Sequence, residues 1–235
     1  MKKIFTDKKI PDPGKKLLLL LSAMSLVCAS LVWYRHLVTG SPMYMFLLWN
    51  LFLAWVPYLI SSYMRWTDSV QRKWYLNLLA GSVWLLFFPN APYILTDLVH
   101  LKPRPDISYW YDFQILLFFC FNSLFIAFAS LIQMKRFIDH FISPFFSHLA
   151  MLFILVLTSF GIYLGRFERY NSWDIVMQPF SLIHDCLHII ANAGDNKKVL
   201  YTTGLLAIFL TFTYFTLVYL FKDHEHRRTP AQKEK

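Results

Sequence analysis

The sequence has few charged residues and few glycines for its length. Of its 235 residues, only 16% are Asp, Glu, Lys or Arg, whereas 57% are hydrophobic and 19% are aromatic. Such a low charge content excludes an ordinary soluble domain, and such a high apolar content excludes a disordered chain. Seven glycines and eleven prolines are too few for a collagen-like or low-complexity protein. The class that remains is an integral membrane protein.

Cysteine and short catalytic motifs are also scarce. Three cysteines cannot form a disulfide framework, and Cys28 and Cys120 lie in long apolar segments, where cysteine behaves as a small hydrophobic residue. The sequence contains no nucleophile elbow, no phosphate-binding glycine loop and no CxxC metal pattern. No short motif therefore identifies a reaction or a redox compartment.

Six uncharged apolar segments are long enough to cross a bilayer, which takes about 20 helical residues. None shows the polar face with a 3.6-residue period that a buried helix of a soluble protein would carry. The predicted spans cover residues 17–34, 42–64, 74–96, 113–134, 141–165 and 199–221. The sequence thus predicts an all-α, polytopic bundle in a single membrane domain, residues 17–221, between a basic tail, 1–16, and a C-terminal tail, 222–235. The first span continues to Trp33 without a small-x-small cleavage site, so we expect a retained helix rather than a signal peptide.

The distribution of lysine and arginine predicts the orientation. Sixteen basic residues fall on the side of the two tails and seven on the other side, so both termini are expected in the cytoplasm. Seven carboxylates accompany the basic residues of the outer side, and the net charge of +9 is therefore concentrated on the cytoplasmic side. Topology explains this charge without a nucleic-acid partner, and attraction to anionic membrane lipid is a secondary effect. The sequence does not indicate an oligomeric state.

The third span ends in FFPNAPYILTDLVH, where Pro89 and Pro92 remove backbone donors and free carbonyls around residues 85–88. A broken helix at membrane depth can build a site, but it can equally be a kink at which Asn90 bonds the loosened backbone. Beyond the break, Asp97 and His100 share a helix face at i and i+3. The carboxylate can orient the imidazole, both can ligate a metal, or the two can be an ordinary pair at a helix end.

Two further motifs follow on the predicted outer side. Asp112 in WYD lies near the start of the fourth span, where helix capping is the simpler explanation. Gly161 and Gly165 at the end of the fifth span form a small-xxx-small face that allows close helix packing. The basic residues Arg166 and Arg169 after it can hold a phosphate or carboxylate, or they can be interfacial anchors paired with Glu168 and flanked by aromatic residues.

These motifs, together with NLFLAWVPY in the second span and GRFERYNSWD after the fifth, resemble the bacterial membrane-protein family catalogued as domain of unknown function 1361. The resemblance runs over residues 50–174 and implies an integral membrane protein of the bacterial envelope, without an assigned reaction, and we expect it in the cytoplasmic (inner) membrane. The candidate positions that it implies are Asn50, Pro57, Pro89, Asn90, Pro92, Tyr93, Asp97, His100, Tyr111, Asp112, Arg166, Asn171, Trp173 and Asp174.

Residues 175–193 are predicted to form an amphipathic helix at the outer surface, because apolar and polar residues alternate with the helical period. His184 and His188 at i and i+4 are candidate zinc ligands, with His100 as a third. The alternative is a wet polar face on this helix. Asn122 in the fourth span is predicted to make a hydrogen bond between helices.

Three functions stay open. The first is an acid/base or metal-assisted enzyme on a lipid-linked or envelope substrate, with its site at the outer surface. The second is a transporter or binding protein for a small anionic solute, and the third is a non-catalytic envelope assembly subunit. The absence of a charge near the middle of any span weighs against a pump. For the enzyme, the predicted catalytic residues are Asp97, His100, Asp112 and Asp174, and the predicted substrate-binding residues are Asn90, Tyr93, Tyr111, Arg166, Asn171 and Trp173. We expect Asp97, His100, Asp112, Arg166 and Asp174 to surround one pocket.

Overall fold

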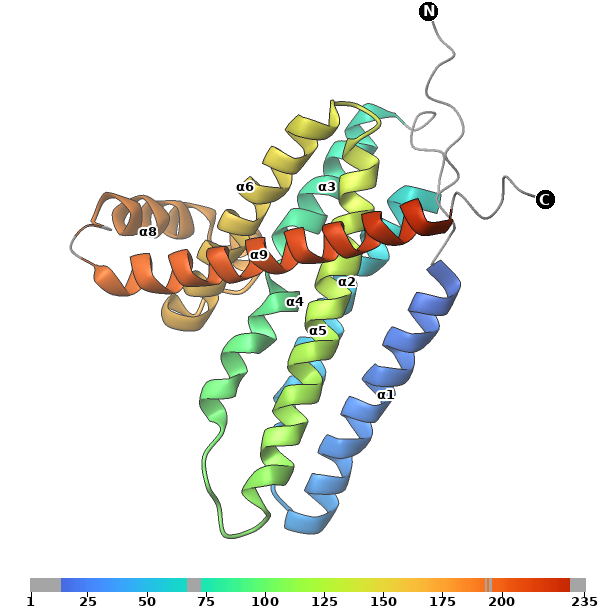
Figure 1. Ribbon diagram of the computed structural model, residues 1–235. Coiled ribbons are helices and arrows are strands. Elements are labelled where there is room, and N and C mark those ends of the chain that lie inside the picture. The colour runs from blue at the N-terminus through green and yellow to red at the C-terminus, as the bar shows by residue number, and fades with distance from the viewer. Residues whose placement is uncertain (1–13, 67–72, 193, 195, 229–235) are drawn as a thin grey trace, which may run out of the picture.

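Every regular element in the described part of the chain is a helix (Figure 1). The computed structural model describes residues 14–66, 73–192, 194 and 196–228. The long helices are α1 (Gly14–Thr39), α2 (Phe46–Trp66), α3 (Trp74–Phe87), α5 (Tyr109–Ile138), α6 (Pro144–Tyr163) and α9 (Lys197–Arg228). The short helical segments are α4 (Asn90–Tyr93), η1 (Ile94–His100), η2 (Leu164–Glu168), α7 (Asp174–Met177) and α8 (Pro179–Ala191).

Six helical segments of the described chain are long and apolar enough to cross a membrane, which confirms the predicted all-α bundle. Several of them run beyond the predicted ends, to Thr39 in α1 and to His100 in the third segment. The predicted spans ended at the first charged residue. The helices continue past those residues because the charges are paired inside the protein.

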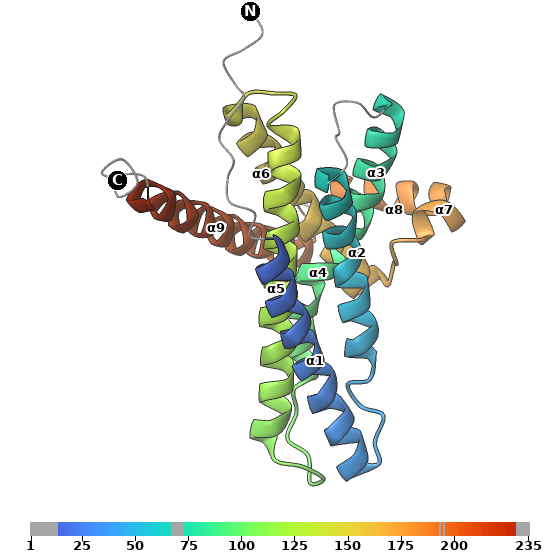
Figure 2. The same ribbon diagram turned by 90° about the vertical axis from the view of Figure 1, so that its right-hand side faces the viewer.

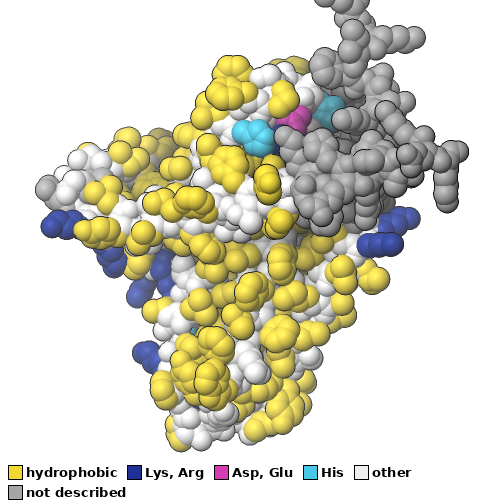
Figure 3. Space-filling model, viewed as in Figure 1, with side chains coloured by type: hydrophobic (Ala, Val, Ile, Leu, Met, Phe, Trp, Pro, Cys, Tyr) yellow, Lys and Arg dark blue, Asp and Glu magenta, His cyan; other side chains and the backbone are white. Residues whose placement is uncertain are grey.

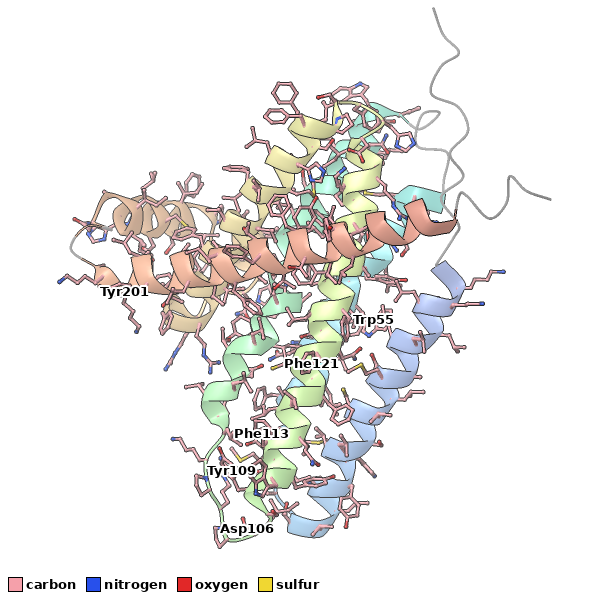
Figure 4. All side chains as sticks on the ribbon, viewed as in Figure 1. Trp55, Asp106, Tyr109, Phe113, Phe121 and Tyr201 are labelled. Atoms are coloured by element: carbon pink, nitrogen blue, oxygen red, sulfur yellow. The ribbon has the colours of Figure 1, made fainter. Side chains whose placement is uncertain are left out.

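The central helix is α5, whose apolar window is the most buried of the six. Helices α1 and α2 pack against it (Figures 1 and 2). Asn122 of α5 donates from Nδ2 to Ser25 Oγ of α1 at 2.8 Å, which confirms the predicted bond between helices. Trp55 of α2 donates from Nε1 to the same oxygen at 3.1 Å and lies between α5 and α1 in Figure 4. Polar groups in a bilayer need such partners, so these bonds also fix the register of the three helices.

The third segment is broken where the two prolines predict it. Helix α3 ends at Phe87, α4 begins at Asn90, and the chain continues as the 3₁₀-helix η1 to His100. The backbone keeps helical angles through Phe88 and Pro89, so the break changes the pitch of the helix without reversing the chain. It brings the α4 and η1 residues against α2, α5 and α6.

Helix α9 crosses the other long helices at a steep angle instead of running alongside them (Figures 1 and 2). It packs mainly on α6, where Tyr214 Oη and His148 Nδ1 are 3.0 Å apart. Its apolar window is the least buried of the six. Hydrophobic side chains cover most of the face shown in Figure 3, whereas Lys and Arg lie toward its edges. This surface fits contact with lipid, as expected of an integral membrane protein.

Candidate functional site

Asp97 is the centre of a polar cluster built by three elements. Its side chain on η1 is only 1% exposed. Asn50 of α2 donates from Nδ2 to Asp97 Oδ2 at 2.9 Å, and Arg166 of η2 donates from Nη1 to Asp97 Oδ1 at 3.2 Å. A carboxylate buried to this extent needs charge-assisted partners. Because a carboxylate only accepts, the Asn50 amide must turn its NH₂ group toward it. We call Asn50, Asp97, His100 and Arg166 the Asp97 cluster.

Arg166 reaches the cluster from a π-helical turn at the end of α6. Such turns widen a helix by one residue and occur frequently at functional sites. Its Nη2 donates to Thr96 O at 3.0 Å and lies 3.2 Å from His100 Nε2. The predicted pairing of the basic residues with Glu168 is therefore not what holds Arg166; Glu168 instead accepts a bond from Tyr163. The ion pair with Asp97 leaves the cluster without formal net charge.

His100 is the accessible titratable group of the cluster, with its side chain 41% exposed. Its Nε2 lies 4.0 Å from Asp97 Oδ1, and Arg166 bonds both residues. A guanidinium has no acceptor, so His100 Nε2 accepts from Arg166 and the proton of the neutral ring lies on Nδ1. The ring also packs edge-on against Phe46, with centroids 5.3 Å apart. Asp97 and His100 lie close together, as their spacing predicts, and Arg166 bonds both of them.

Asp112 does not belong to the Asp97 cluster, so the prediction that it lines a common pocket with Asp97 is wrong. It accepts two bonds from Arg35 of α1, from Nε at 2.7 Å and from Nη2 at 3.2 Å, and both side chains are 1% exposed. This bidentate geometry is the strongest form of an arginine–carboxylate pair. Arg35 lies just beyond the predicted first span, residues 17–34, but α1 continues to Thr39 and carries Arg35 into the α1–α5 interface.

Tyr44 connects the two ion pairs. Its hydroxyl donates to His100 O at 3.3 Å, and the Arg35 guanidinium carbon lies 5.1 Å from the centre of its ring. Burial, followed by the negative charge of Asp112, raises the pKa of Tyr44. The phenol therefore stays protonated and able to donate. The sequence did not point to Tyr44, Arg35 or Ser172 as site residues. The available signal for the Arg35–Asp112 ion pair was a single Arg and a single Asp at the same predicted end of two spans.

A cavity of about 520 Å³ lies beside the Asp97 cluster, within the size range of small-molecule sites. Its walls are mostly apolar and include no Asp, Glu, Lys, Arg, His or Cys of the described chain. Asn50 belongs to both the cavity wall and the Asp97 cluster, and Tyr93 of the wall packs 6.0 Å from the Arg166 guanidinium carbon. The lining residues are Trp49, Asn50, Leu53, Ser82, Leu85, Leu86, Pro89, Asn90, Tyr93, Gly161, Leu164, Gly165, Tyr170, Asn171, Ser172, Ile175 and Leu182.

Asn90 closes the helix break and lines the cavity at the same time. Its Nδ2 donates to Phe87 O at 2.9 Å and to Ser172 Oγ at 2.8 Å. Ser172 in turn donates to Leu86 O at 3.1 Å. Two backbone carbonyls at the helix break, Leu86 O and Phe87 O, thus have side-chain partners, as backbone groups at membrane depth require. The kink interpretation of Asn90 is confirmed, and the cavity lies at that kink.

Gly161 of α6 and Gly165 of η2 allow this close packing, as the small-xxx-small pattern predicts. A Cβ at Gly161 would lie 3.1 Å from Pro89 Cγ, and one at Gly165 would lie 3.2 Å from the Tyr93 ring. We expect Gly161→Ala to destabilise the protein by about 1–3 kcal/mol, because the proline ring has little freedom to move away. Thermal unfolding in detergent measures this. Gly204→Ala on α9, where a Cβ meets nothing within 4 Å, is the matched control and should change little.

The remaining predicted site residues do not join the Asp97 cluster. Asp174 accepts from Asn171 N at 2.6 Å and from Asn171 Nδ2 at 3.5 Å, which closes the turn before α7. Tyr111 donates to Leu31 O at 2.9 Å and so packs α5 on α1. Trp173 precedes α7 and is substantially exposed. The five residues expected around one pocket therefore divide: Asp97, His100 and Arg166 meet, whereas Asp112 and Asp174 have separate partners.

The amphipathic helix predicted at residues 175–193 is found as α7 and α8, with a break between Met177 and Pro179. His184 and His188 stack with ring centroids 6.4 Å apart on its polar side, and His184 Nδ1 lies 3.2 Å from Asp185 Oδ1. Among the described residues, no group of three or more His, Cys, Asp or Glu side chains could hold a metal. The zinc set of His100, His184 and His188 is thus not brought together.

Tyr170 ties α8 to the cavity. It lines the cavity and donates from its hydroxyl to Asp185 Oδ2 at 2.6 Å. This bond lowers the pKa of Asp185 and raises the pKa of Tyr170. The hydrogen bond between Tyr170 and Asp185 therefore forms at pH values above the lowered pKa of Asp185 and below the raised pKa of Tyr170. It is lost when the pH falls through the first pKa or rises through the second.

Fold and site together define an α-helical integral membrane protein with a buried ion-pair cluster beside an uncharged cavity. The family model described as "Protein of unknown function (DUF1361)" matches residues 49–218, and the chain belongs to this family. No curated protein and no solved structure shows a significant match. The family assignment confirms the resemblance given by the proline-break, WYD and GRFERYNSWD motifs, and it carries no assigned activity.

Proposed function

We propose that the chain is a multi-pass protein of the bacterial inner membrane, with both termini in the cytoplasm and the Asp97 cluster facing outward. The 16 to 7 division of basic residues supports this orientation. Ser108 and Asn196 lie in the connections that lead into α5 and α9, which this orientation places outside.

Impermeant thiol reagents test the orientation. In a background lacking Cys28, Cys120 and Cys186, single cysteines at Ser108 and Asn196 should be labelled in intact cells. A cysteine at Ser143, in the connection between α5 and α6, should be labelled only after the cells are opened. Ser69, another predicted cytoplasmic position, lies outside the described residues. Labelling of Ser143 in intact cells would reverse the proposed topology.

We propose further that the protein is an enzyme that binds a lipid-linked envelope substrate in the cavity and acts on it with the neighbouring Asp97 cluster. The observation that carries this proposal is the shared wall: Asn50 lines the cavity and bonds Asp97 at 2.9 Å. An apolar cavity with a few fixed polar groups suits an amphiphile that enters from the bilayer. A titratable group beside such a cavity is where acid/base chemistry is expected.

Within this proposal His100 is the acid/base group, because it is the exposed imidazole of the cluster. Arg166 and Asp97 are positioning residues: Arg166 fixes the tautomer of His100, and buried Asp97 holds Arg166 and Asn50. Asp112 and Asp174 have no proposed part in the reaction, since their partners are Arg35 and Asn171. An imidazole can both accept and release a proton, which is what general acid/base catalysis needs.

The anionic-solute alternative receives less support from the geometry. Both terminal nitrogens of Arg166 already bond protein groups, namely Asp97, Thr96 O and His100. An incoming anion would have to displace the buried carboxylate. A non-catalytic assembly subunit would convert no lipid, and the lipid-conversion experiment described next tests this alternative.

The experiment places purified protein in nanodiscs made from the total lipid extract of a bacterial envelope and follows lipid species over time by mass spectrometry. The wild type should convert at least one species. Ser82→Phe, which fills the cavity from an exposed wall position of α3, should slow that conversion at least tenfold. Gly204→Phe on α9, in open space, should leave the rate unchanged. No conversion by the wild type, or equal rates for the wild type and Ser82→Phe, would exclude the proposed enzyme.

A further inference from the structure

We propose that the cavity selects a lipid whose polar part is uncharged and carries hydrogen-bond donors, such as the hydroxyls of a sugar head group. This inference rests on the proposed function, because it names the chemical class of the substrate that the cavity takes. It starts from three asparagines of the cavity wall, Asn50, Asn90 and Asn171, which come from α2, α4 and the loop before α7.

Each of the three asparagines turns its NH₂ group toward a protein acceptor. Asn50 Nδ2 donates to the Asp97 carboxylate and Asn90 Nδ2 to Phe87 O. Asn171 Nδ2 lies 3.5 Å from the Asp174 carboxylate, which also accepts the Asn171 backbone N–H at 2.6 Å. All three partners are acceptors only, so none of the amides can exchange its nitrogen and oxygen without losing a bond.

Asn90 thus uses both N–H groups of its amide, whereas Asn50 and Asn171 each use one, and the three amide oxygens remain as acceptors for a ligand. Within the described chain, no protein group donates to the Oδ1 of Asn50, Asn90 or Asn171. The oxygens of Asn50 and Asn90 are not among the buried, unpaired polar atoms of the described residues, and Asn171 is an exposed residue, so each oxygen is open to solvent or ligand. An accepting oxygen in an apolar wall binds a donor strongly, because the alternative is a desolvated group without a partner.

The rest of the wall is consistent with this preference. It has no charged side chain to neutralise a phosphate, and the Tyr170 hydroxyl is already committed to Asp185. The hydroxyls of Ser82 and Tyr93 can donate or accept and so adapt to a sugar. A site that hydrogen-bonds hydroxyls discriminates strongly against analogues that lack them, since its own acceptors are then left unpaired.

The test compares three probes with the same ten-carbon chain: decyl β-glucoside, its fully O-methylated form and decylphosphocholine. The methylated glucoside keeps the size of the sugar but has no donors, and the phosphocholine has charge but no donors. Binding to the full chain in nanodiscs, below the micelle concentration of each probe, is measured by competition with radiolabelled decyl glucoside. The glucoside should bind at least tenfold more tightly than either of the others.

Substitutions of the cavity asparagines test which residues cause the preference for a ligand with hydrogen-bond donors. Asn90→Leu should weaken glucoside binding about tenfold and leave the weak binding of the methylated form unchanged. Asn171→Leu, at an exposed loop position that packs no helix, should weaken it severalfold and serves where Asn90→Leu does not fold. Asn192→Leu is the matched control, because Asn192 lies at the end of α8 and does not line the cavity.

Equal affinity for the glucoside and its methylated form, or tighter binding of the phosphocholine, would overturn the inference. Loss of glucoside binding in Asn192→Leu to the same degree as in Asn171→Leu would also overturn it. If Ser82→Phe still slows lipid conversion in those cases, the proposed function stands and only the donor preference fails. If no probe binds and no lipid is converted, the proposed function itself fails.

Discussion

Replacement of Asp112 by Asn should destabilise the folded protein by about 3–5 kcal/mol, which is the usual consequence of removing one partner of a buried ion pair. Arg35 and Asp112 are each 1% exposed and share a bidentate contact. Without the carboxylate, the guanidinium stays charged in a dry interface between α1 and α5, because arginine does not lose its proton in proteins. Urea or dodecyl sulfate unfolding in micelles, followed by circular dichroism, measures the loss.

A second ion pair in the same chain provides the control. Lys135 Nζ and Asp139 Oδ2 are 2.8 Å apart at i and i+4 near the end of α5, with side chains 14% and 30% exposed. The identical change, Asp139→Asn, should cost clearly less, about 1 kcal/mol, since both side chains of this pair are partly exposed and asparagine can still accept a bond from the lysine. Equal losses for Asp112→Asn and Asp139→Asn would contradict the structural role given to Asp112.

The double variant Arg35→Met, Asp112→Leu should recover most of the lost stability. Apolar side chains of similar volume need no desolvation of charges, and they often match or exceed the stability of a buried pair. Recovery in the double variant would assign the effect to the unpaired charge. A double variant as unstable as Asp112→Asn would instead mean that packing around Arg35 dominates.

Replacement of His100 by Gln should lower the rate of lipid conversion roughly 10² to 10⁴-fold, the usual contribution of a general acid or base. Glutamine keeps an oxygen that can accept the bond from Arg166, so the Asp97 cluster should stay assembled and unfolding should be little changed. The wild-type rate should show a pH dependence from the titration of His100, and this dependence should disappear in His100→Gln. A purely structural histidine would lower stability and rate together without altering the pH profile.

Asp97→Asn distinguishes positioning from chemistry. It keeps hydrogen-bonding atoms beside Asn50 and Arg166 but leaves the guanidinium, which is 17% exposed, without its ion-pair partner. We expect a lower rate together with a measurable loss of stability, in contrast to His100→Gln. If both variants lost stability while any remaining folded protein converted lipid at the normal rate, the cluster would be structural and the assembly-subunit function would be favoured.

Local signals in the sequence were sufficient for the membrane class and for the helix break. Long uncharged apolar segments require helices in a bilayer, and that requirement does not depend on neighbouring segments. Pro89 and Pro92 break the third segment because each lacks a backbone donor, and Asn90 bonds the backbone nearby at Phe87 O. The small-xxx-small pattern at Gly161 and Gly165 indicated close packing, but their partners Pro89 and Tyr93 follow only from the fold.

Partners of the charged residues were decided by the tertiary structure alone. Arg35 and Asp112 are 77 residues apart, and Arg166 and Asp97 are 69 apart. A charge at the edge of an apolar segment looks the same in sequence whether it ends the span in water or continues it against a partner. The packing of α1 on α5 and of η2 on η1 resolves this, because burial makes each charge depend on one opposite charge within about 3 Å. The cavity depends on the same packing, since its walls come from α2, α3, α6 and the segment before α8, whose residues meet only in the folded bundle.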